Sequence, residues 1–245
     1  MPKLHTRLTN VKNPQERTQN NLNRTAVEDY LKAIYLLQEE KSPVSTSRIA
    51  DARQVKAASV TNMIQRLAKM ELVHYQKYDG VTLTEAGQQC ALEMLRHHRI
   101  IELYLIEALN FGWEEVHDQA EVLEHVISEE MEERMAAALG YPSFGAYGRP
   151  IPTRQGELEV IEAEPLTEIS ANTMVTVAYI ADDTNRELLT CLAEKNILPG
   201  TTMCVVEKVP ISGSIILKIN NKFVVLESNS ASMVRVKIAS ETEVQ

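Results

Sequence analysis

Residues 45–84 read STSRIADARQVKAASVTNMIQRLAKMELVHYQKYDGVTLT, and this segment sets the architecture of the front of the chain. Apolar residues recur at helical spacing in two runs, Ser45 to about Gln54 and Ala57 to Lys69. The short connection Val55-Lys56 between them is what a helix-turn-helix needs. The segment therefore predicts a helix-turn-helix whose second helix carries the recognition residues.

A β-hairpin is predicted directly after these helices. Residues 73–78 and 81–84 have the composition of strands, and Asp79-Gly80 between them supplies a turn with positive φ. A further helix, from Thr25 as N-cap to Gln38, is predicted before them. Helix, helix-turn-helix and hairpin in this order predict a winged helix-turn-helix.

Two longer helices are predicted downstream, from Glu85 to about Asn110 and from about Glu114 to Leu139. The second carries an apolar stripe made of Val116, Ala120, Leu123, Ile127, Met131 and Met135. Gly140-Tyr141-Pro142 ends it, and the Gly- and Pro-rich residues 143–156 predict a linker.

The last third of the chain has β-like character. Its short apolar runs are 174–179, 202–206, 214–219, 223–226 and 233–236, with one short helix over 186–195. The turn pairs Pro199-Gly200, Ser212-Gly213 and Asn220-Asn221 separate several of these runs. A small β-barrel fits this pattern best.

The expected fold class is mainly α with a small β part. The predicted divisions are a flexible tail 1–23, a winged helix-turn-helix 24–85, a helical domain 86–142, a linker 143–160 and a small β-domain 161–242. The polar N-terminus lacks an apolar signal core, and no apolar run is long enough to span a membrane. We therefore expect a cytoplasmic protein.

The net charge of −9 is distributed unevenly. Residues 1–85 hold 13 Lys/Arg and 9 Asp/Glu, a net of +4, whereas residues 86–245 hold 12 and 25, a net of −13. The front can approach phosphates and the back can attract cations. The 3 cysteines form no CxxC pair, so neither a disulfide framework nor a thiolate zinc site is indicated.

The residues most informative about function are potential metal ligands in the second long helix. At offsets of zero, four, seven and eight, four side chains fall on one side of it: His117, Glu121, Glu124 and His125. His98 and Glu102, four apart on the preceding helix, add a second pair. Such ligands favour manganese, iron(II) or zinc, and the spacing does not choose among them. The alternative is an ordinary solvated acidic helix face.

Enzyme signatures do not fit. The helix offers E-x-x-E-H where an inverzincin needs H-x-x-E-H, and a di-iron bundle needs two Glu-x-x-His helices. No G-x-S-x-G, Walker loop or G-x-G-x-x-G occurs. We expect a protein that is not an enzyme.

DNA contacts are expected from the start of the recognition helix, whose first turns face base edges in a helix-turn-helix. The candidate residues are Lys56, Ala58, Ser59, Thr61 and Asn62, with Arg48 and Arg66. Asn62 could pair with adenine, and Arg66 could contact phosphate. Read alone, the polar residues are ordinary helix-surface residues; the hairpin after the helix favours DNA binding.

These features resemble the diphtheria toxin repressor and manganese transport regulator family of metal-dependent transcriptional repressors. The markers are Glu28-Asp29-Tyr30-Leu31-Lys32-Ala33-Ile34-Tyr35, Arg48-Ile49-Ala50, Ser59-Val60-Thr61, His98-Arg99, His117-Asp118-Gln119-Ala120 and Glu124-His125. The C-terminal barrel looks like the SH3-like domain of the longer members.

The resemblance implies two ligand sets. They are a primary site of Asp29, Glu121, Glu124 and His125, and an ancillary site of His98, Glu102 and His117, to which Asp182 or Asp183 of the barrel could add a ligand, Asp183 being the one we name. The iron-responsive branch carries Met and Cys where this chain has Asp29 and Glu121, and the oxygen ligands favour manganese. Lys32 replaces a second carboxylate of the short manganese regulators, which argues against a bridged binuclear site.

The resemblance therefore implies a Mn²⁺-dependent homodimer that binds a palindromic operator in double-stranded DNA and represses metal-uptake genes, with no membrane partner. Fe²⁺ is the alternative metal, and Zn²⁺ or Co²⁺ could substitute in vitro. Two other functions stay open: a metal-dependent hydrolase or metal-storage protein, and a constitutive repressor in which metal is merely structural.

Overall fold

The computed structural model describes residues 14–239, with side chains from Asn23 onward. The chain divides into two compact units, one formed by Met1–Arg96 with Arg154–Gly156 and the other by His97–Thr153 with Glu157–Gln245. No helix of the described part is both long and apolar enough to cross a bilayer. Each unit is described by itself.

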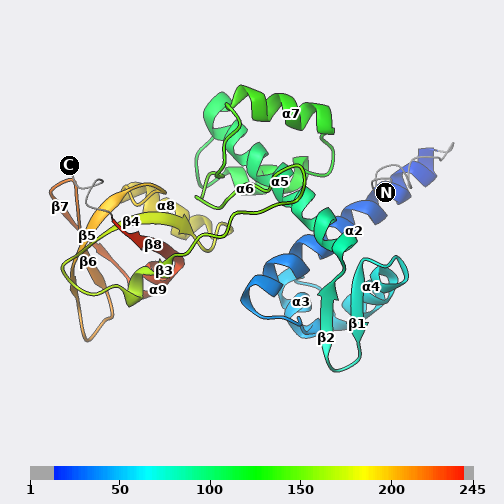
Figure 1. Ribbon diagram of the computed structural model, residues 1–245, viewed down its shortest axis with the longest axis horizontal. Helices are drawn as coiled ribbons and strands as arrows, with labels where there is room; N and C mark the ends of the chain where they lie inside the picture. Colours follow the sequence, from blue (N-terminus) through cyan, green and yellow to red (C-terminus); the bar gives the residue numbers. More distant parts are fainter. Residues whose placement is uncertain (1–13, 240–245) are drawn as a thin grey trace. The chain divides into compact units, whose positions relative to one another are not determined.

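The N-terminal unit is a winged helix-turn-helix, as predicted (Figure 1). Its elements are α2 (Pro14–Glu40), α3 (Thr46–Arg53), α4 (Ala57–Lys69), β1 (Val73–Gln76), β2 (Gly80–Leu83) and the first part of α5 (Glu85–Leu109). Its core combines apolar residues of these helices and strands, among them Leu31, Ile34, Ile49, Val60, Ile64, Leu67 and Val81.

The first helix is longer than predicted. α2 begins at Pro14, so Thr25 lies inside the helix and is not its N-cap. Residues 14–23 of the expected flexible tail are therefore helical, and residues 1–13 of that tail lie outside the described residues. Proline suits the first helical position, because its missing N–H would have no partner within the helix.

The connection between α3 and α4 follows from local geometry. Ser45 is the N-cap of α3, and its hydroxyl accepts a hydrogen bond from the backbone N–H of Arg48. Gln54 ends α3 in the left-handed conformation at φ 51°, and its N–H closes back onto α3 carbonyls. This cap turns the chain into α4 within three residues.

The hairpin forms, but its turn differs from the predicted one. Gly80 has the predicted positive φ, at 111°, but it pairs with Gln76 in the ladder, so the turn is 77–79 and Tyr78 within it also has a positive φ, of 76°. A Cβ on Gly80 would lie 2.8 Å from the carbonyl oxygen of Val44, so the glycine serves close packing and not only the turn.

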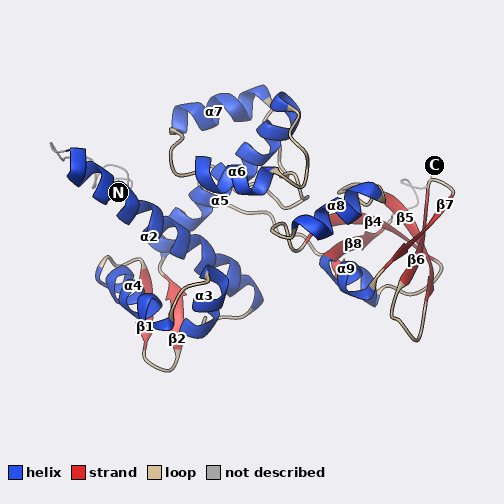
Figure 2. Cartoon of the chain, turned by 180° about the vertical axis from the view of Figure 1, so that it is seen from behind, coloured by secondary structure: helices blue, strands red, loops and turns tan. Residues whose placement is uncertain are grey.

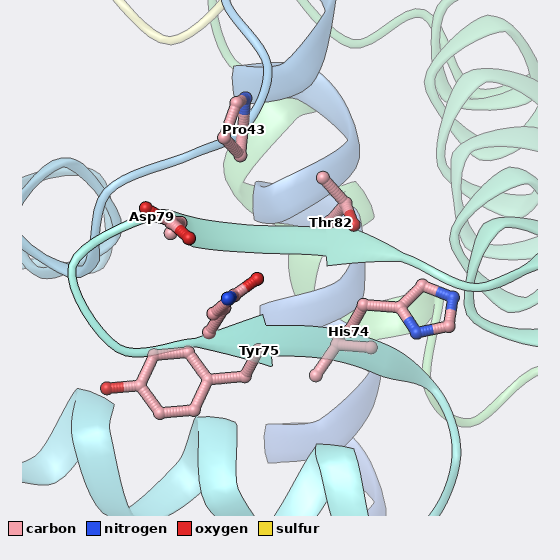
Figure 3. Close-up of a pocket in the computed structure, with 8 residues that line it drawn as sticks. Pro43, His74, Tyr75, Asp79 and Thr82 are labelled. Atoms are coloured by element: carbon pink, nitrogen blue, oxygen red, sulfur yellow. The ribbon is translucent and has the colours of Figure 1, made fainter.

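A hollow of about 470 Å³ lies against this hairpin (Figure 3). Its lining is Pro43, Val73, His74, Tyr75, Gln76, Asp79, Gly80 and Thr82. Figure 3 shows His74 and Asp79 at opposite ends of the hairpin, so the hollow does not bring its titratable groups together.

The helical part of the C-terminal unit contains a break that the sequence analysis missed. The single helix predicted over 114–139 is two helices, α6 (Val116–Leu123) and α7 (Glu129–Ala138). Ser128 caps α7 by accepting a hydrogen bond from the backbone N–H of Met131, which starts a new helix. Met131, predicted to face inward, is 44% exposed as a result.

The C-terminal part is an antiparallel sheet with the strand order β3-β8-β4-β5-β6-β7 (Figure 2). The elements are β3 (Glu164–Pro165), the 3₁₀ turn η1 (Leu166–Glu168), β4 (Thr173–Ile180), α8 (Arg186–Glu194), β5 (Thr202–Lys208), β6 (Ile215–Ile219), β7 (Lys222–Leu226), α9 (Ser228–Met233) and β8 (Val234–Ile238). The predicted small β-domain is confirmed as an antiparallel sheet, but the sheet is not closed into a barrel, because β3 and β7 stay at opposite edges of the described sheet.

The predicted linker is not a loose segment. It has no helix or strand over 143–160, yet Tyr147 in it is 2% exposed. The Tyr147 hydroxyl donates a hydrogen bond of 2.9 Å to the carbonyl of Trp113, and the Trp113 indole N–H donates one of 3.0 Å to the carbonyl of Ala146. These bonds tie the segment to the start of α6.

Candidate metal centre

A buried cluster of imidazoles and carboxylates lies where α5 and α6 meet. His98 and Glu102, one turn apart on α5, are 4% and 1% exposed. His98 Nε2 lies 2.9 Å from Glu102 Oε1 and 3.2 Å from His117 Nδ1, while His117 Nδ1 lies 3.4 Å from Glu102 Oε1. The three residues predicted as the ancillary set are therefore brought together.

The other ring nitrogen of His98 faces residues of the predicted primary set. His98 Nδ1 lies 2.5 Å from Glu124 Oε2 and 3.7 Å from Glu121 Oε1. His117 Nε2 in turn lies 3.9 Å from Glu121 Oε1. The five side chains thus form one connected cluster, in which His98 contacts both predicted sets.

Glu124 and His125 follow the last residue of α6 and do not lie within one long helix, as the spacing assumed. His117 and Glu121 are on α6, whereas Glu124 is the C-cap of that helix and His125 lies in the turn before α7. His125 Nε2 is 3.6 Å from Glu124 Oε1. A turn therefore positions these two residues.

The cluster has opposing effects on the pKa values of its members. Burial would raise the pKa of Glu102, but the charge of His98 and hydrogen bonds from His117 and His98 lower it to about 2. Burial would lower the pKa of His117, but its hydrogen bond to Glu102 and the charge of Asp183 raise it. The carboxylate is thus kept ionised beside imidazoles, whose protons a bound cation would displace.

Asp183, the residue named for the C-terminal domain, lies within electrostatic reach of this cluster. Its negative charge contributes to the raised pKa of His117 and, after burial and Glu102, to the raised pKa of Tyr147. The neighbouring Asp182 accepts hydrogen bonds from the backbone N–H and hydroxyl of Thr184 at 3.1 and 2.8 Å. Neither aspartate belongs to a group of potential ligand atoms within 4.8 Å of one another among the described residues, so a ligand from this domain stays a prediction.

Asp29 belongs to the N-terminal unit, where its carboxylate oxygen Oδ2 lies 2.5 Å from Arg53 Nη2. Spacing along the chain gave no signal for it, because it is far from the other candidates in sequence. Its role as a ligand stays a prediction from the family resemblance.

The sequence analysis missed one buried polar pair next to the cluster. His97 and Glu132 are 5% and 3% exposed, and His97 Nε2 lies 3.0 Å from Glu132 Oε2. The available signal was the consecutive pair His97-His98, which places imidazoles on two sides of α5.

The donor set fits a divalent cation. Ligand atoms of His98, Glu102 and His117 lie within 4.8 Å of one another, as do those of His98, Glu121 and Glu124. They are imidazole nitrogens and carboxylate oxygens, with no thiolate or thioether in either group. Such a set suits manganese, iron(II) or zinc.

The predicted DNA-contacting residues lie at the accessible end of α4. Lys56 is the N-cap residue, and the side chains of Lys56, Ala58, Ser59 and Asn62 are exposed. Thr61 is half-buried, and its hydroxyl donates a hydrogen bond to the carbonyl of Ala57 at 3.1 Å.

Both predicted arginines have protein partners. Arg48 Nη2 lies 2.5 Å from Glu40 Oε2, and Arg66 Nη1 donates to Asn23 Oδ1 at 3.1 Å. A DNA phosphate would have to compete with these exposed contacts, which are individually weak in water.

Comparison with known protein families covers most of the chain. Residues 24–81 match the N-terminal DNA-binding domain of the iron-dependent repressors, residues 84–153 match their metal-binding and dimerisation domain, and residues 164–238 match the FeoA domain.

Individual proteins are similar to most of the chain or to its first part. The iron-dependent repressor IdeR of Mycobacterium tuberculosis is 30% identical over 226 residues, covering 86% of this chain and 96% of that protein. The regulator MntR of Bacillus pumilus is 37% identical over 103 residues, covering 42% of this chain and 71% of that protein.

Solved structures are also similar to this chain. A manganese-dependent transcriptional repressor in complex with manganese has a TM-score of 0.80 and 34% identity, covering 87% of this chain and all of the other. The manganese regulator SloR has a TM-score of 0.69 and 30% identity, covering 87% of this chain and 98% of the other.

Proposed function

The chain belongs to the iron-dependent repressor family of metal-dependent transcriptional regulators, and from this premise we propose that it is a manganese-activated repressor of metal-uptake genes. It acts in this proposal as a homodimer on a palindromic operator. The coarser function, metal-dependent regulation of transcription through DNA binding, comes with the family.

The observation that carries the choice of manganese is the chemistry of the buried cluster. Its donors are carboxylate oxygens and imidazole nitrogens, and softer sulfur ligands are absent from its described members. Carboxylate-rich sites suit manganese, whereas thiolate shifts preference toward softer metals. The similarity to a manganese-bound repressor supports the same choice.

Iron(II) is the second candidate, because the similarity to IdeR extends over 86% of the chain. Imidazole and carboxylate also bind iron(II), so the ligand types alone reduce the choice to these two metals and zinc.

We assign the ligands as the family resemblance implies. Asp29, Glu121, Glu124 and His125 serve the primary site, and His98, Glu102, His117 and Asp183 serve the ancillary site. A bound cation would supply positive charge that balances the clustered carboxylates.

Metal and DNA binding are then linked. If metal favours the DNA-binding state of the dimer, DNA must tighten metal binding by the same factor. The chain's own contribution is to hold the ligand side chains in place and to present the exposed start of α4 to the major groove.

A mobility-shift assay with operator DNA tests this proposal. We expect manganese-dependent binding that a chelator abolishes, and tighter DNA binding at saturating manganese than at saturating iron(II) or zinc under reducing conditions, because selectivity among these metals comes from coordination geometry and not from metal affinity alone. Glu124→Ala should weaken the metal response, whereas Glu130→Ala, which removes an exposed carboxylate of α7, should not.

Equal DNA binding with and without chelator would refute metal activation and would favour a constitutive repressor with a structural metal. Tighter activation by iron(II) would refute the choice of manganese but leave the repressor function in place.

A further inference from the structure

His97 and Glu132 form a buried polar contact that the proposed ligand sets do not use. The two side chains are 7% and 5% exposed, and Nε2 of His97 lies 3.0 Å from Oε2 of Glu132, close together but without the geometry of a hydrogen bond. Burying charged groups is costly unless they are paired. Glu132 is such a buried carboxylate, in the first turn of α7, and it lies against His97 of α5.

The second ring nitrogen of His97 contacts the backbone of Glu124. His97 Nδ1 lies 3.4 Å from the backbone oxygen of Glu124, to which only a ring N–H can donate. Glu124 is the C-cap of α6, and the turn after it carries His125. From its position on α5, His97 thus contacts both the end of α6 and α7.

The contact of His97 is with Glu124, whose side chain belongs to the cluster. Glu124 Oε2 lies 2.5 Å from His98 Nδ1, and Glu124 is 1% exposed. The backbone N–H of Glu124 donates to the carbonyl of Ala120 at 2.9 Å, as in a helix, and on the other side of this residue the ring of His97 lies against the Glu124 carbonyl. The imidazole of His97 supplies a fixed point for the turn after α6.

We propose that His97 is a positioning residue for metal binding, which holds the carbonyl of Glu124 at the start of the turn 124–126 and packs against Glu132 of α7 with its other ring nitrogen. This inference rests on the proposed metal-dependent function. Groups that orient metal ligands commonly affect metal affinity by about 10–100-fold when removed. Ligands must be held to within about 0.5 Å of the productive geometry.

Two substitutions separate the two contacts of His97. The amide nitrogen of asparagine falls near Nδ1 of histidine, so His97→Asn keeps a donor for the Glu124 carbonyl and loses the contact with Glu132. The amide of glutamine reaches the position of Nε2, so His97→Gln keeps the Glu132 contact and loses the donor. Glu130→Gln is the matched control, because Glu130 is 76% exposed and pairs with Arg134.

The measurement is manganese affinity of the full-length protein, from the loss of the free-ion electron paramagnetic resonance signal, with thermal unfolding of the metal-free protein beside it. We expect His97→Gln to weaken manganese binding on the order of tenfold. We expect His97→Asn to retain most of the affinity and Glu130→Gln all of it.

Wild-type affinity in His97→Gln would overturn the inference. Equal losses of affinity in both variants, following equal losses of melting temperature, would also overturn it, because His97 would then be only structural. If the unsubstituted protein bound no manganese, the proposed function itself would fail, a result distinct from either.

Discussion

His98 has one ring nitrogen toward Glu102 and His117 and the other toward Glu124 and Glu121. The hydrogen bond made by one nitrogen of a histidine decides which form the other presents to a ligand. A substitution that alters the hydrogen bond at one ring nitrogen of His98 therefore alters how the other nitrogen binds its partners. The resemblance assigns His98 to the ancillary set alone, but its side chain contacts residues of both sets.

Glu121 allows the choice of metal to be tested at a single atom. Its side chain is 34% exposed, so a substitution there is better tolerated than at the buried Glu102 or Glu124. Glu121→Cys exchanges an oxygen ligand for sulfur, and we expect the ratio of iron(II) to manganese affinity to rise on the order of tenfold. Competitive titration of the two metals under reducing conditions measures this ratio.

Glu121→Gln is the control for that experiment, because it removes the charge without adding sulfur. It should weaken both metals and leave their ratio nearly unchanged. If the ratio in Glu121→Cys matched that of the control, the argument from ligand softness would be wrong.

At the scale of elements, α4 carries one residue expected to read a base and another expected to contact phosphate. Asn62 is exposed in the second turn of α4, and Arg66 lies one turn further on. We expect Asn62→Ala to cost about 1–3 kcal/mol on the preferred operator and to relax its sequence preference. Arg66→Ala should weaken binding to all sequences alike and lower the salt dependence.

Binding curves on the operator, on operators with one altered base pair, and at several salt concentrations distinguish the two effects. A uniform loss with Asn62→Ala would show that this side chain does not read a base.

The elements with strong local signals were predicted correctly. The apolar spacing of α3 and α4 and the short connection between them identified the helix-turn-helix, and Asn220-Asn221, both at positive φ, marked the turn between β6 and β7. The break between α6 and α7 was missed because the apolar period continues through it. Ser128 followed by two glutamates is a helix start that could have shown it.

Other features depend on contacts distant in sequence. β3 is only two residues long and pairs with β8, so no period can reveal it. Whether a six-stranded sheet closes depends on its edges, which local patterns do not report. For the same reason spacing identified His117 and Glu121 as neighbours but could not find the contact between His97 and Glu132.

For the whole molecule, the proposed homodimer fixes the spacing of the operator. Two recognition helices related by a two-fold axis reach half-sites about one helical turn apart, roughly 34–36 Å. Inserting about 5 base pairs between the half-sites turns one of them to the opposite face of the DNA, and we expect affinity to fall on the order of tenfold or more.

The same insertion placed outside the two half-sites is the control and should leave affinity unchanged. Equal binding to both insertions would mean that each subunit reads its half-site independently. The mobility-shift assay with saturating manganese measures all three DNAs.

Trp113 is the only tryptophan in the sequence, and its ring centroid lies 5.2 Å from that of Tyr147. Burial and then the negative charges of Glu102 and Asp183 raise the pKa of Tyr147. A cation held by those carboxylates would cancel the field that they exert on this aromatic pair. The chain thus carries an intrinsic fluorophore in contact with Tyr147, and we expect the emission of the unlabelled protein to report loading of the proposed ancillary site separately from the DNA response.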